Sequence, residues 1–185
     1  IDAGDIGAVR KLAPGTLPLP DELACPYMLK FEASPHLAAE EEGVELKFKT
    51  VMDAIDRIER EFNPDVLLLE GAGGVCVPLG NELLNTHLMA CVGAPAIIVA
   101  DAGLGSINHT LLTLRELRAG DVPVEGVAIN NMPEHPGKIE LDNLKMIERL
   151  GRVEILAVVR RNPDLSGNGF ESSERLSEVL RRQGL

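Results

Sequence analysis

The segment Asp65–Gly80, with the sequence DVLLLEGAGGVCVPLG, constrains the fold of this chain more than any other stretch. Its apolar run Val66–Leu69 follows Asn63-Pro64 and precedes a Gly-Ala-Gly-Gly turn. A short apolar run bounded by turn residues is typical of a strand that is buried on both faces of a parallel sheet. Glu70 then lies at the carboxyl end of the predicted strand, where open parallel sheets bind their ligands. The segment therefore predicts one wall of a nucleotide or metal site.

Further apolar runs follow at roughly thirty-residue intervals, with a helical pattern in each gap. The predicted strands, which we expect to be buried, are Ala94–Asp101, Val124–Asn130 and Glu154–Val159. The predicted helices are Ile1–Leu12 with Ala8, Val9 and Leu12 turned inward, Pro35–Glu42 behind Ser34 as N-cap, Thr50–Phe62, Leu83–Val92, a helix from the N-cap Ser106 to Gly120, Leu141–Leu150, and a last helix from Ser172 or Ser173 to about Gln183. This rhythm predicts an α/β fold, a mostly parallel sheet flanked by helices in one domain over residues 1–185.

The charge of the chain limits its partners. It carries 18 Lys and Arg against 29 Asp and Glu, a formal net charge of −11. Such a chain repels nucleic acid and anionic membranes, so we expect a small-molecule or protein partner. The cysteines Cys25, Cys76 and Cys91 show no metal-ligand spacing, and no apolar run approaches the length of a membrane span. These features predict reduced thiols and a cytoplasmic location.

Three predicted strands end in a polar side chain: Glu70, Asp101 and Asn130. Because parallel strands place their carboxyl ends at one edge of a sheet, we expect a ligand site there. Glu70 suits Mg²⁺, a hard cation that prefers oxygen ligands, and Asp5 could supply a second oxygen. Structural alternatives stay open, because Glu70 could cap the amides of the Gly73–Gly74 turn and Asp5 could be a solvated helix-start residue.

The segment Gly103–His109, GLGSINH, has the pattern of a turn followed by a helix start. The amides of Gly105, Ser106 and Ile107 could bind a carboxylate or phosphate, because helix N-termini favour anions. Ordinary capping by Ser106 is the structural alternative. Asn108 is a poor helix former so early in a helix, which favours a polar role for this segment.

Asn130 and Asn131 end a predicted strand together. An asparagine side chain offers one acceptor and two donors, which complement the edge of an adenine base. An asparagine-rich turn with no ligand is the structural alternative.

Taken together, the motifs EGAGGVCVPL, GLGSINHTLLT and GVAINN resemble those of the dethiobiotin synthetase family, in the order and spacing of that family. The segment PYMLKFEASPHLAA followed by EEG resembles the part that precedes them, so the resemblance covers nearly the whole chain. It implies a three-layer P-loop NTPase-like fold and a homodimer. It also implies a cyclo-ligase of biotin synthesis that forms C–N bonds. Such an enzyme carboxylates 7,8-diaminopelargonate with CO₂, phosphorylates the carbamate with ATP and closes the ureido ring, with Mg²⁺ on the phosphates.

The same resemblance implies roles for individual residues. The magnesium site would be formed by Asp5 and Glu70. The nucleotide contacts would come from the phosphate-lining turn, an adenine-reading pair and a backbone segment that closes over the base: Asp5, Glu70, Gly71, Ala72, Gly73, Asn130, Asn131, Ala157, Val158, Val159 and Asp164. The contacts with the substrate carboxylate, made across the dimer, would come from Gly105, Ser106, Ile107 and Asn108.

The chain departs from the family pattern in its first part. No GxxxxGK[ST] motif occurs in its 185 residues, and the strand, P-loop and helix that open the family have no counterpart here. A unit of that kind takes about 30 residues or more, so we expect this chain to be a carboxyl-terminal portion without the P-loop and the catalytic lysine. It would then contain no catalytic residue and be nearly inactive alone.

Two other functions stay open. One is a regulatory or interaction domain that kept the fold and lost the P-loop. The other is a related ligase of the cobyrinate-amidating kind. Asp101, at a position where many relatives carry a basic or neutral residue, and Ala157, where proline is common, leave the fine substrate and nucleotide preference open.

Overall fold

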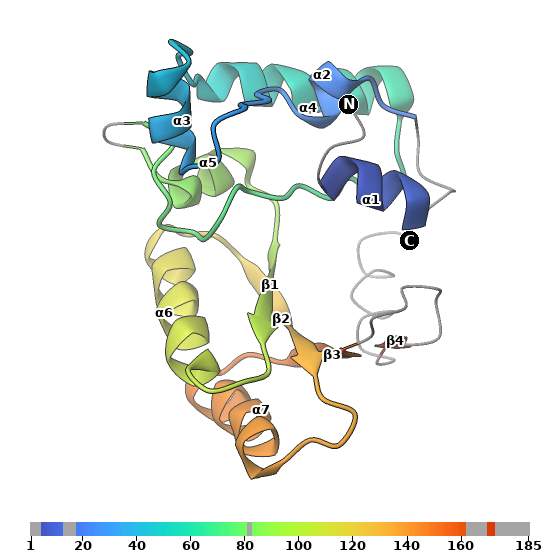
Figure 1. The fold of residues 1–185 in the computed structure, drawn as a ribbon, viewed down its shortest axis with the longest axis vertical. Helices are drawn as coiled ribbons and strands as arrows, with labels where there is room; N and C mark the ends of the chain where they lie inside the picture. Colours follow the sequence, from blue (N-terminus) through green and yellow to red (C-terminus); the bar gives the residue numbers. More distant parts are fainter. Residues whose placement is uncertain (1–4, 13–17, 81–82, 162–169, 173–185) are drawn as a thin grey trace. The chain divides into compact units, whose positions relative to one another are not determined.

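The computed structural model describes residues 5–12, 18–80, 83–161 and 170–172. Its contacts divide the chain into two compact units, Ile1–Gly73 with Val77–Leu88 and Gly74–Cys76 with Met89–Leu185. Figure 1 labels the helices and strands of both units. Within those described ranges, no helix has both the length and the apolar character that crossing a bilayer requires.

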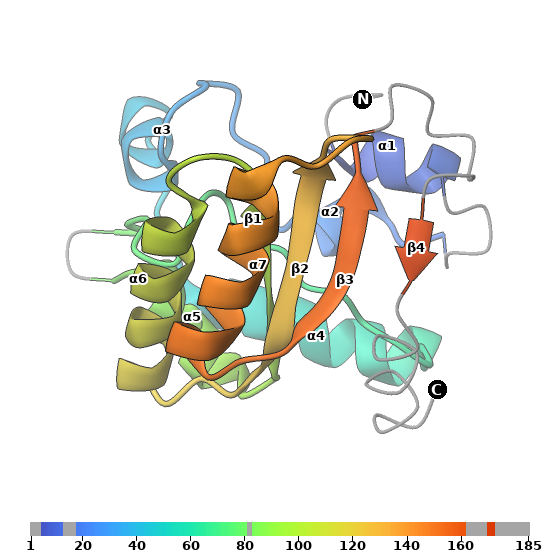
Figure 2. The same cartoon turned by 90° about the horizontal axis from the view of Figure 1, so that it is seen from below.

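The second unit is built on one four-stranded sheet of order β1-β2-β3-β4. Its strands and their connecting helices are β1 (Ala96–Asp101), α6 (Ser106–Ala119), β2 (Val124–Met132), α7 (Lys138–Gly151), β3 (Ile155–Arg160) and β4 (Phe170–Ser172). β1, β2 and β3 run parallel, and β4 is antiparallel to β3. Parallel neighbours need a crossover connection, and here α6 and α7 provide it on the same face of the sheet (Figure 2). The predicted α/β fold with a mostly parallel sheet is confirmed.

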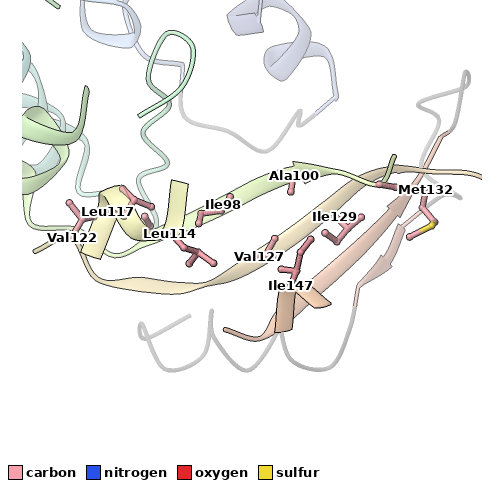
Figure 3. Packing of buried hydrophobic residues seen from close by; sticks show 11 residues of the cluster. Ile98, Ala100, Leu114, Leu117, Val122, Val127, Ile129, Met132 and Ile147 are labelled. Atoms are coloured by element: carbon pink, nitrogen blue, oxygen red, sulfur yellow. The ribbon is translucent and has the colours of Figure 1, made fainter. Parts of the chain in front are cut away.

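An aliphatic core fills the space between the sheet and these two helices (Figure 3). Leu114 and Leu117 of α6 and Ile147 of α7 pack with Val127 and Ile129 of β2, and all five side chains are at most 1% exposed. A spacing of three residues places Leu114 and Leu117 on one face of α6. Burying each such side chain contributes about 1.5–3 kcal/mol, so this cluster is the main source of stability in the second unit.

The first unit is helical. Its helices are α1 (Asp5–Leu12), α2 (Asp21–Ala24), α3 (Pro35–Glu41) and α4 (Phe48–Phe62), and α5 (Asn85–Val92) begins in it. Ala54 and Ile58, one turn apart on α4, pack with Leu23 of α2 in a small core. The helices predicted over Pro35–Glu42 and Thr50–Phe62 are therefore confirmed, within one or two residues at their ends.

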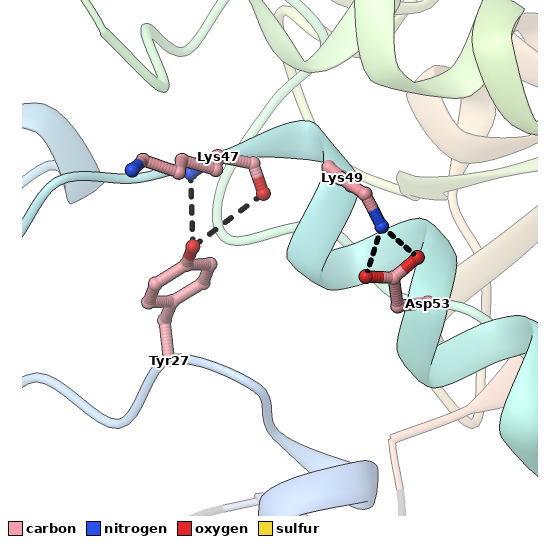
Figure 4. A network of polar contacts seen from close by, with 4 residues as sticks. All are labelled: Tyr27, Lys47, Lys49 and Asp53. Carbon is pink, nitrogen blue, oxygen red and sulfur yellow. Dashed lines mark hydrogen bonds and ion pairs between the residues drawn. The ribbon is translucent and has the colours of Figure 1, made fainter.

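Polar contacts fasten the start of α4. The hydroxyl oxygen of Tyr27 accepts a hydrogen bond of 2.9 Å from the backbone N–H of Lys47, one residue before the helix (Figure 4). Lys49 forms an ion pair of 2.6 Å with Asp53, one turn further along the helix. Exposed pairs of this kind contribute only a few tenths of a kcal/mol, so the buried face of α4 decides its position.

The prediction of a strand over Val66–Leu69 is wrong. Residues 66–70 form no β-ladder with any described residue, and the side chains of Leu68 and Leu69 are 84% and 50% exposed. A strand is defined by hydrogen bonds to a neighbouring strand, which an apolar run does not supply by itself. Glu70 and its glycine turn consequently follow an extended segment and not a strand of the described sheet.

β1 was expected to be buried on both faces, and only one face is. Ile98 is 8% exposed and belongs to the core cluster, whereas Val99 is 68% exposed. Successive side chains of a strand point to opposite faces of the sheet, and in β1 the face of Ile98 packs in the core with α6 whereas the face of Val99 is exposed.

Two helix predictions also need correction. Val9 of α1 is 51% exposed, so the face of this helix predicted to turn inward does not. Ser172, expected as a helix cap, is the last residue of β4. Residues 173–185, where the last helix was predicted, lie outside the described part of the chain.

The core predicts a position-dependent effect of leucine truncation on α6. Leu114 is 1% exposed and Leu112 is 55% exposed on the same helix. We expect Leu114→Ala to lower the free energy of unfolding by about 2–5 kcal/mol, because it leaves a cavity in the core. Urea unfolding checks this, with Leu112→Ala as the matched control, which should change stability by no more than about 0.5 kcal/mol. Equal losses in both variants would contradict the packing described above.

Candidate functional site

The turn Glu70–Gly73 is shaped by contacts within the first unit. The side-chain amide of Asn85, 4% exposed at the start of α5, donates a hydrogen bond of 3.1 Å to the carbonyl oxygen of Ala72. Gly73 has a φ of +77°, and a Cβ atom there would lie 2.9 Å from Cγ2 of Val77. A buried donor and a position that only glycine tolerates therefore fix the conformation of this turn.

The carboxylate of Glu70 is exposed beside this turn, and among the described residues it has no hydrogen-bond or ion-pair partner. The structural alternative, in which Glu70 caps the amides of Gly73–Gly74, is thus not realised. No three histidine, cysteine, aspartate or glutamate side chains of the described part converge on one point. Asp5 is the first residue of α1, and its side chain lies outside the description. The pairing of Asp5 with Glu70 in a magnesium site stays a prediction.

The sheet edge of the second unit brings three predicted polar residues together. Asp101 at the end of β1 is the direct neighbour of Asn130 on β2. Oδ1 of Asp101 accepts a hydrogen bond of 3.0 Å from the side-chain amide of Asn131, whose φ is +58°. The backbone N–H of Asn131 in turn donates to Oδ1 of Asn130 at 2.8 Å. The expected meeting of Asp101 and Asn130 at the carboxyl edge is confirmed, whereas Glu70, the third residue expected there, does not end a strand of the described sheet.

The loop after β1 is held on both of its sides. Oδ2 of Asp101 accepts a hydrogen bond of 2.9 Å from the N–H of Gly103. The side-chain amide of Asn143 donates bonds of 2.8 Å to the carbonyl oxygens of both Ala102 and Gly103. The hydroxyl of Ser106 donates to the carbonyl oxygen of Asp101. Few conformations are left to a loop with so many of its backbone groups paired.

The start of α6 differs from the prediction at its cap. Gly105, with a φ of +92°, is the N-cap and supplies no side-chain hydrogen bond. Ser106, expected as the cap, is 4% exposed and donates instead to Asp101. Asn108 is exposed and Leu104, at the tip of the turn, is 90% exposed. The first amides of α6 are thus left without a side-chain cap, as an anion-binding helix terminus requires.

The predicted nucleotide-binding residues of β3 are partly or fully buried. Ala157–Val159 lie within β3, where their backbone pairs with β2 on one side and with β4 on the other. Ala157 is 5% exposed. Asp164 lies outside the described residues. The roles of these four residues stay predictions.

Sequence reasoning missed two buried asparagines, Asn85 and Asn143, which are 4% and 6% exposed. Each donates a side-chain hydrogen bond to a carbonyl of a predicted ligand loop. The available signal for Asn143 was its place one turn before Ile147 on an apolar helix face. A polar residue at such a position must be hydrogen-bonded when buried, and loop carbonyls are the usual partners.

A comparison with known protein families shows the class to which this protein belongs. A family model described as an AAA domain matches residues 4–168. With the mostly parallel sheet and its carboxyl-edge site, this places the chain among P-loop NTPase-like proteins.

Individual relatives narrow that class. The chain is 34% identical to the ATP-dependent dethiobiotin synthetase of Anoxybacillus flavithermus, over 85% of this chain and 68% of the relative. It is 37% identical to that of Bacillus subtilis, over 72% of this chain and 57% of the relative. It is 39% identical to that of Chlorobaculum tepidum, over 69% and 52%. The chain belongs to the dethiobiotin synthetase family, and its matches span between about half and two thirds of these relatives.

The geometry of the first turn predicts different tolerance at two adjacent glycines. Gly73→Ala should lower the free energy of unfolding by about 1–2 kcal/mol, because its positive φ and its contact with Val77 both disfavour a Cβ atom. A Cβ atom at Gly74 would meet nothing within 4 Å, so Gly74→Ala is the control and should change stability little. Urea unfolding of both variants measures the difference. Comparable stability of the two would show that the turn is not constrained as described.

The carboxyl group of Asp101 predicts a loss of stability at acidic pH. Its pKa is lowered, first by the N–H of Gly103 and next by the side chain of Asn131, which stabilise the charged form. This contribution to stability is present above the ordinary pKa of aspartate and is lost as the pH falls through the lowered value. We expect Asn131→Gly to raise the pKa of Asp101 toward its ordinary value, as followed by a carbon-13 titration of the carboxyl group. Asn63→Gly is the control, because Asn63 also has a positive φ, of +43°, but makes no described contact with Asp101.

Proposed function

We propose that this chain belongs to an enzyme that closes the ureido ring of dethiobiotin from 7,8-diaminopelargonate and CO₂, with ATP and Mg²⁺. Relatives named as ATP-dependent dethiobiotin synthetases supply the reaction class. The observation that carries the proposal is the sheet edge of the second unit, where the uncapped start of α6 follows directly on the Asp101–Asn131 contact. Such an edge can receive a base and an anionic group side by side.

The nucleotide base would be read by Asn130 with Asn131. Oδ1 of Asn130 already accepts a hydrogen bond from the N–H of Asn131. The side-chain nitrogen of Asn130 can then donate to a ring nitrogen of adenine. In this proposal Ala157–Val159 and Asp164 border the base and complete the nucleotide contacts.

The phosphates would be met by the turn Glu70–Gly73, whose constrained backbone lets a ligand approach closely. An exposed carboxylate such as that of Glu70 fits a hard cation, so Glu70, together with Asp5, is the proposed holder of Mg²⁺. The bound ion would neutralise charge on the phosphates.

The substrate carboxylate would bind at the start of α6. Ile107 and Asn108 lie in its uncapped first turn, and Gly105 and Ser106 set the turn that precedes them. In the proposed reaction an amine of 7,8-diaminopelargonate attacks CO₂ and loses a proton to give a carbamate. A carbamate oxygen then attacks the γ-phosphorus of ATP, and ADP leaves. The second amine then attacks the carbonyl carbon and phosphate leaves. We further propose a homodimer, in which the exposed Leu104 at the tip of this turn reaches the partner subunit.

The direct test is product formation by the natural full-length protein that carries these residues. Incubation with 7,8-diaminopelargonate, bicarbonate, ATP and Mg²⁺ should yield dethiobiotin, detected by mass spectrometry, and omission of ATP should abolish it. A protein that binds ATP without forming dethiobiotin would point to a related ligase with another substrate. A protein that does neither would point to a regulatory domain of the same fold.

The proposed metal role predicts the effect of Glu70→Gln, which removes the charge and keeps the size of the side chain. We expect turnover at a fixed Mg²⁺ concentration to fall about 100-fold or more, with a higher Mg²⁺ concentration needed for half-maximal rate. Glu59→Gln, an exposed glutamate of α4, is the matched control. An unchanged Mg²⁺ dependence in Glu70→Gln would remove Glu70 from the metal site.

A further inference from the structure

Asp101 contacts no ligand in the function proposed above, although it ends β1 beside Asn130 at the carboxyl edge of the sheet. Its two carboxylate oxygens serve two different elements. Oδ2 accepts from the N–H of Gly103 in the loop before α6, and Oδ1 accepts from the side chain of Asn131 near the end of β2. We propose that Asp101 is a positioning residue that fixes the position of the base-reading end of β2, with Asn130 and Asn131, relative to the loop of residues 102–105 before α6, the substrate loop. This inference rests on the proposed function.

The contact of Asp101 with Asn131, which we call the first arm, orients Asn130. Asp101 fixes the side-chain amide of Asn131, whose backbone has a φ of +58°, in the left-handed region that non-glycine residues adopt infrequently. The N–H of the same residue holds Oδ1 of Asn130. The hydrogen bonds therefore run from the carboxylate through Asn131 to Asn130, and they orient the Asn130 amide so that its nitrogen can donate to a base.

The contact of Asp101 with Gly103, the second arm, holds the substrate loop in position. A Cβ atom on Gly103 would lie 3.0 Å from Oδ2 of Asp101, so the carboxylate and the loop backbone are already in close contact. The carbonyl oxygens of Ala102 and Gly103 are held from the other side by Asn143. The carbonyl oxygen of Asp101 itself receives the hydroxyl of Ser106. Asp101 thus fixes both ends of the turn that leads into the uncapped first turn of α6.

The occupied oxygens argue against a direct role for Asp101 in the chemistry. Both already accept strong hydrogen bonds from the protein, and a carboxylate placed next to an anionic ligand would repel it unless its charge were compensated. The two donors and the positive charge of Arg161, which also lowers the pKa of this carboxyl group, provide that compensation. Asp101 therefore acts on ligands through Asn131 and Gly103.

The test uses the natural full-length protein and three variants. Asp101→Asn weakens both arms, because one side-chain oxygen and one amide replace two acceptors. The double variant Asp101→Asn with Asn131→Asp restores an amide–carboxylate pair in the reverse direction and keeps an acceptor for Gly103. Asp142→Asn, an exposed aspartate of α7, controls for the loss of a negative charge.

We expect Asp101→Asn to raise the KM values for ATP and for 7,8-diaminopelargonate about 10-fold each, with kcat within about 2-fold of wild type. Discrimination between ATP and CTP should fall in the same variant. The double variant should recover most of both KM values, and Asp142→Asn should match wild type. A calorimetric dissociation constant for ATP should follow the KM for ATP, so that the effect is also seen without turnover.

If Asp101→Asn does not fold, Asn131→Gly provides the test, because glycine accepts the positive φ and only the first arm is lost. It should raise the KM for ATP and leave that for 7,8-diaminopelargonate unchanged. Unchanged KM values in Asp101→Asn would overturn the positioning role, and so would a double variant whose KM values are no lower than those of Asp101→Asn. Dethiobiotin formation by the wild-type protein would still support the proposed function in either case. A wild-type protein that neither binds ATP nor forms dethiobiotin would overturn both.

Discussion

The parallel pairing of β1 with β2 is the constraint on which the second unit depends. Its register makes Asp101 and Asn130 direct neighbours at the carboxyl edge. The crossover that this pairing requires places α6 against the sheet and its first turn just beyond Asp101. Core packing, through Leu114 and Leu117 on α6, and the polar site at the start of the same helix are therefore consequences of one strand pairing.

The helices and strands with a regular spacing of apolar residues were the part of the fold that could be predicted from the sequence. The helices over Thr50–Phe62 and from Ser106 to Gly120, and the strands β1, β2 and β3, were predicted within about two residues, since each has an unambiguous apolar period. The run Val66–Leu69 has the same composition as a buried strand, yet Leu68 is 84% exposed. Composition shows that a segment can enter a sheet. Only a partner with free backbone groups decides that it does, and partners distant in sequence leave no local signal.

The candidate site could be predicted from the sequence to a similar extent. Strand ends identified Asp101 and Asn130, because the edge of a parallel sheet follows from topology alone. Ser106 was misjudged as a cap, since the glycine before it takes that place and its hydroxyl turns to Asp101. The contact of Asp101 with Asn131 joins positions 30 residues apart, and no spacing rule within one element could have shown it.

The two loops that we predict to bind ligands, one in each unit, are held by the same kind of contact. Asn85 donates to the carbonyl of Ala72 in the glycine turn, and Asn143 donates to the carbonyls of Ala102 and Gly103 in the loop before α6. Each asparagine is buried at a helix position, so its own freedom was lost when the core formed and not when a ligand binds. A loop whose carbonyls are held in this way pays little entropy on binding an anion. The buried asparagines therefore hold both loops in one conformation through contacts that form when the chain folds.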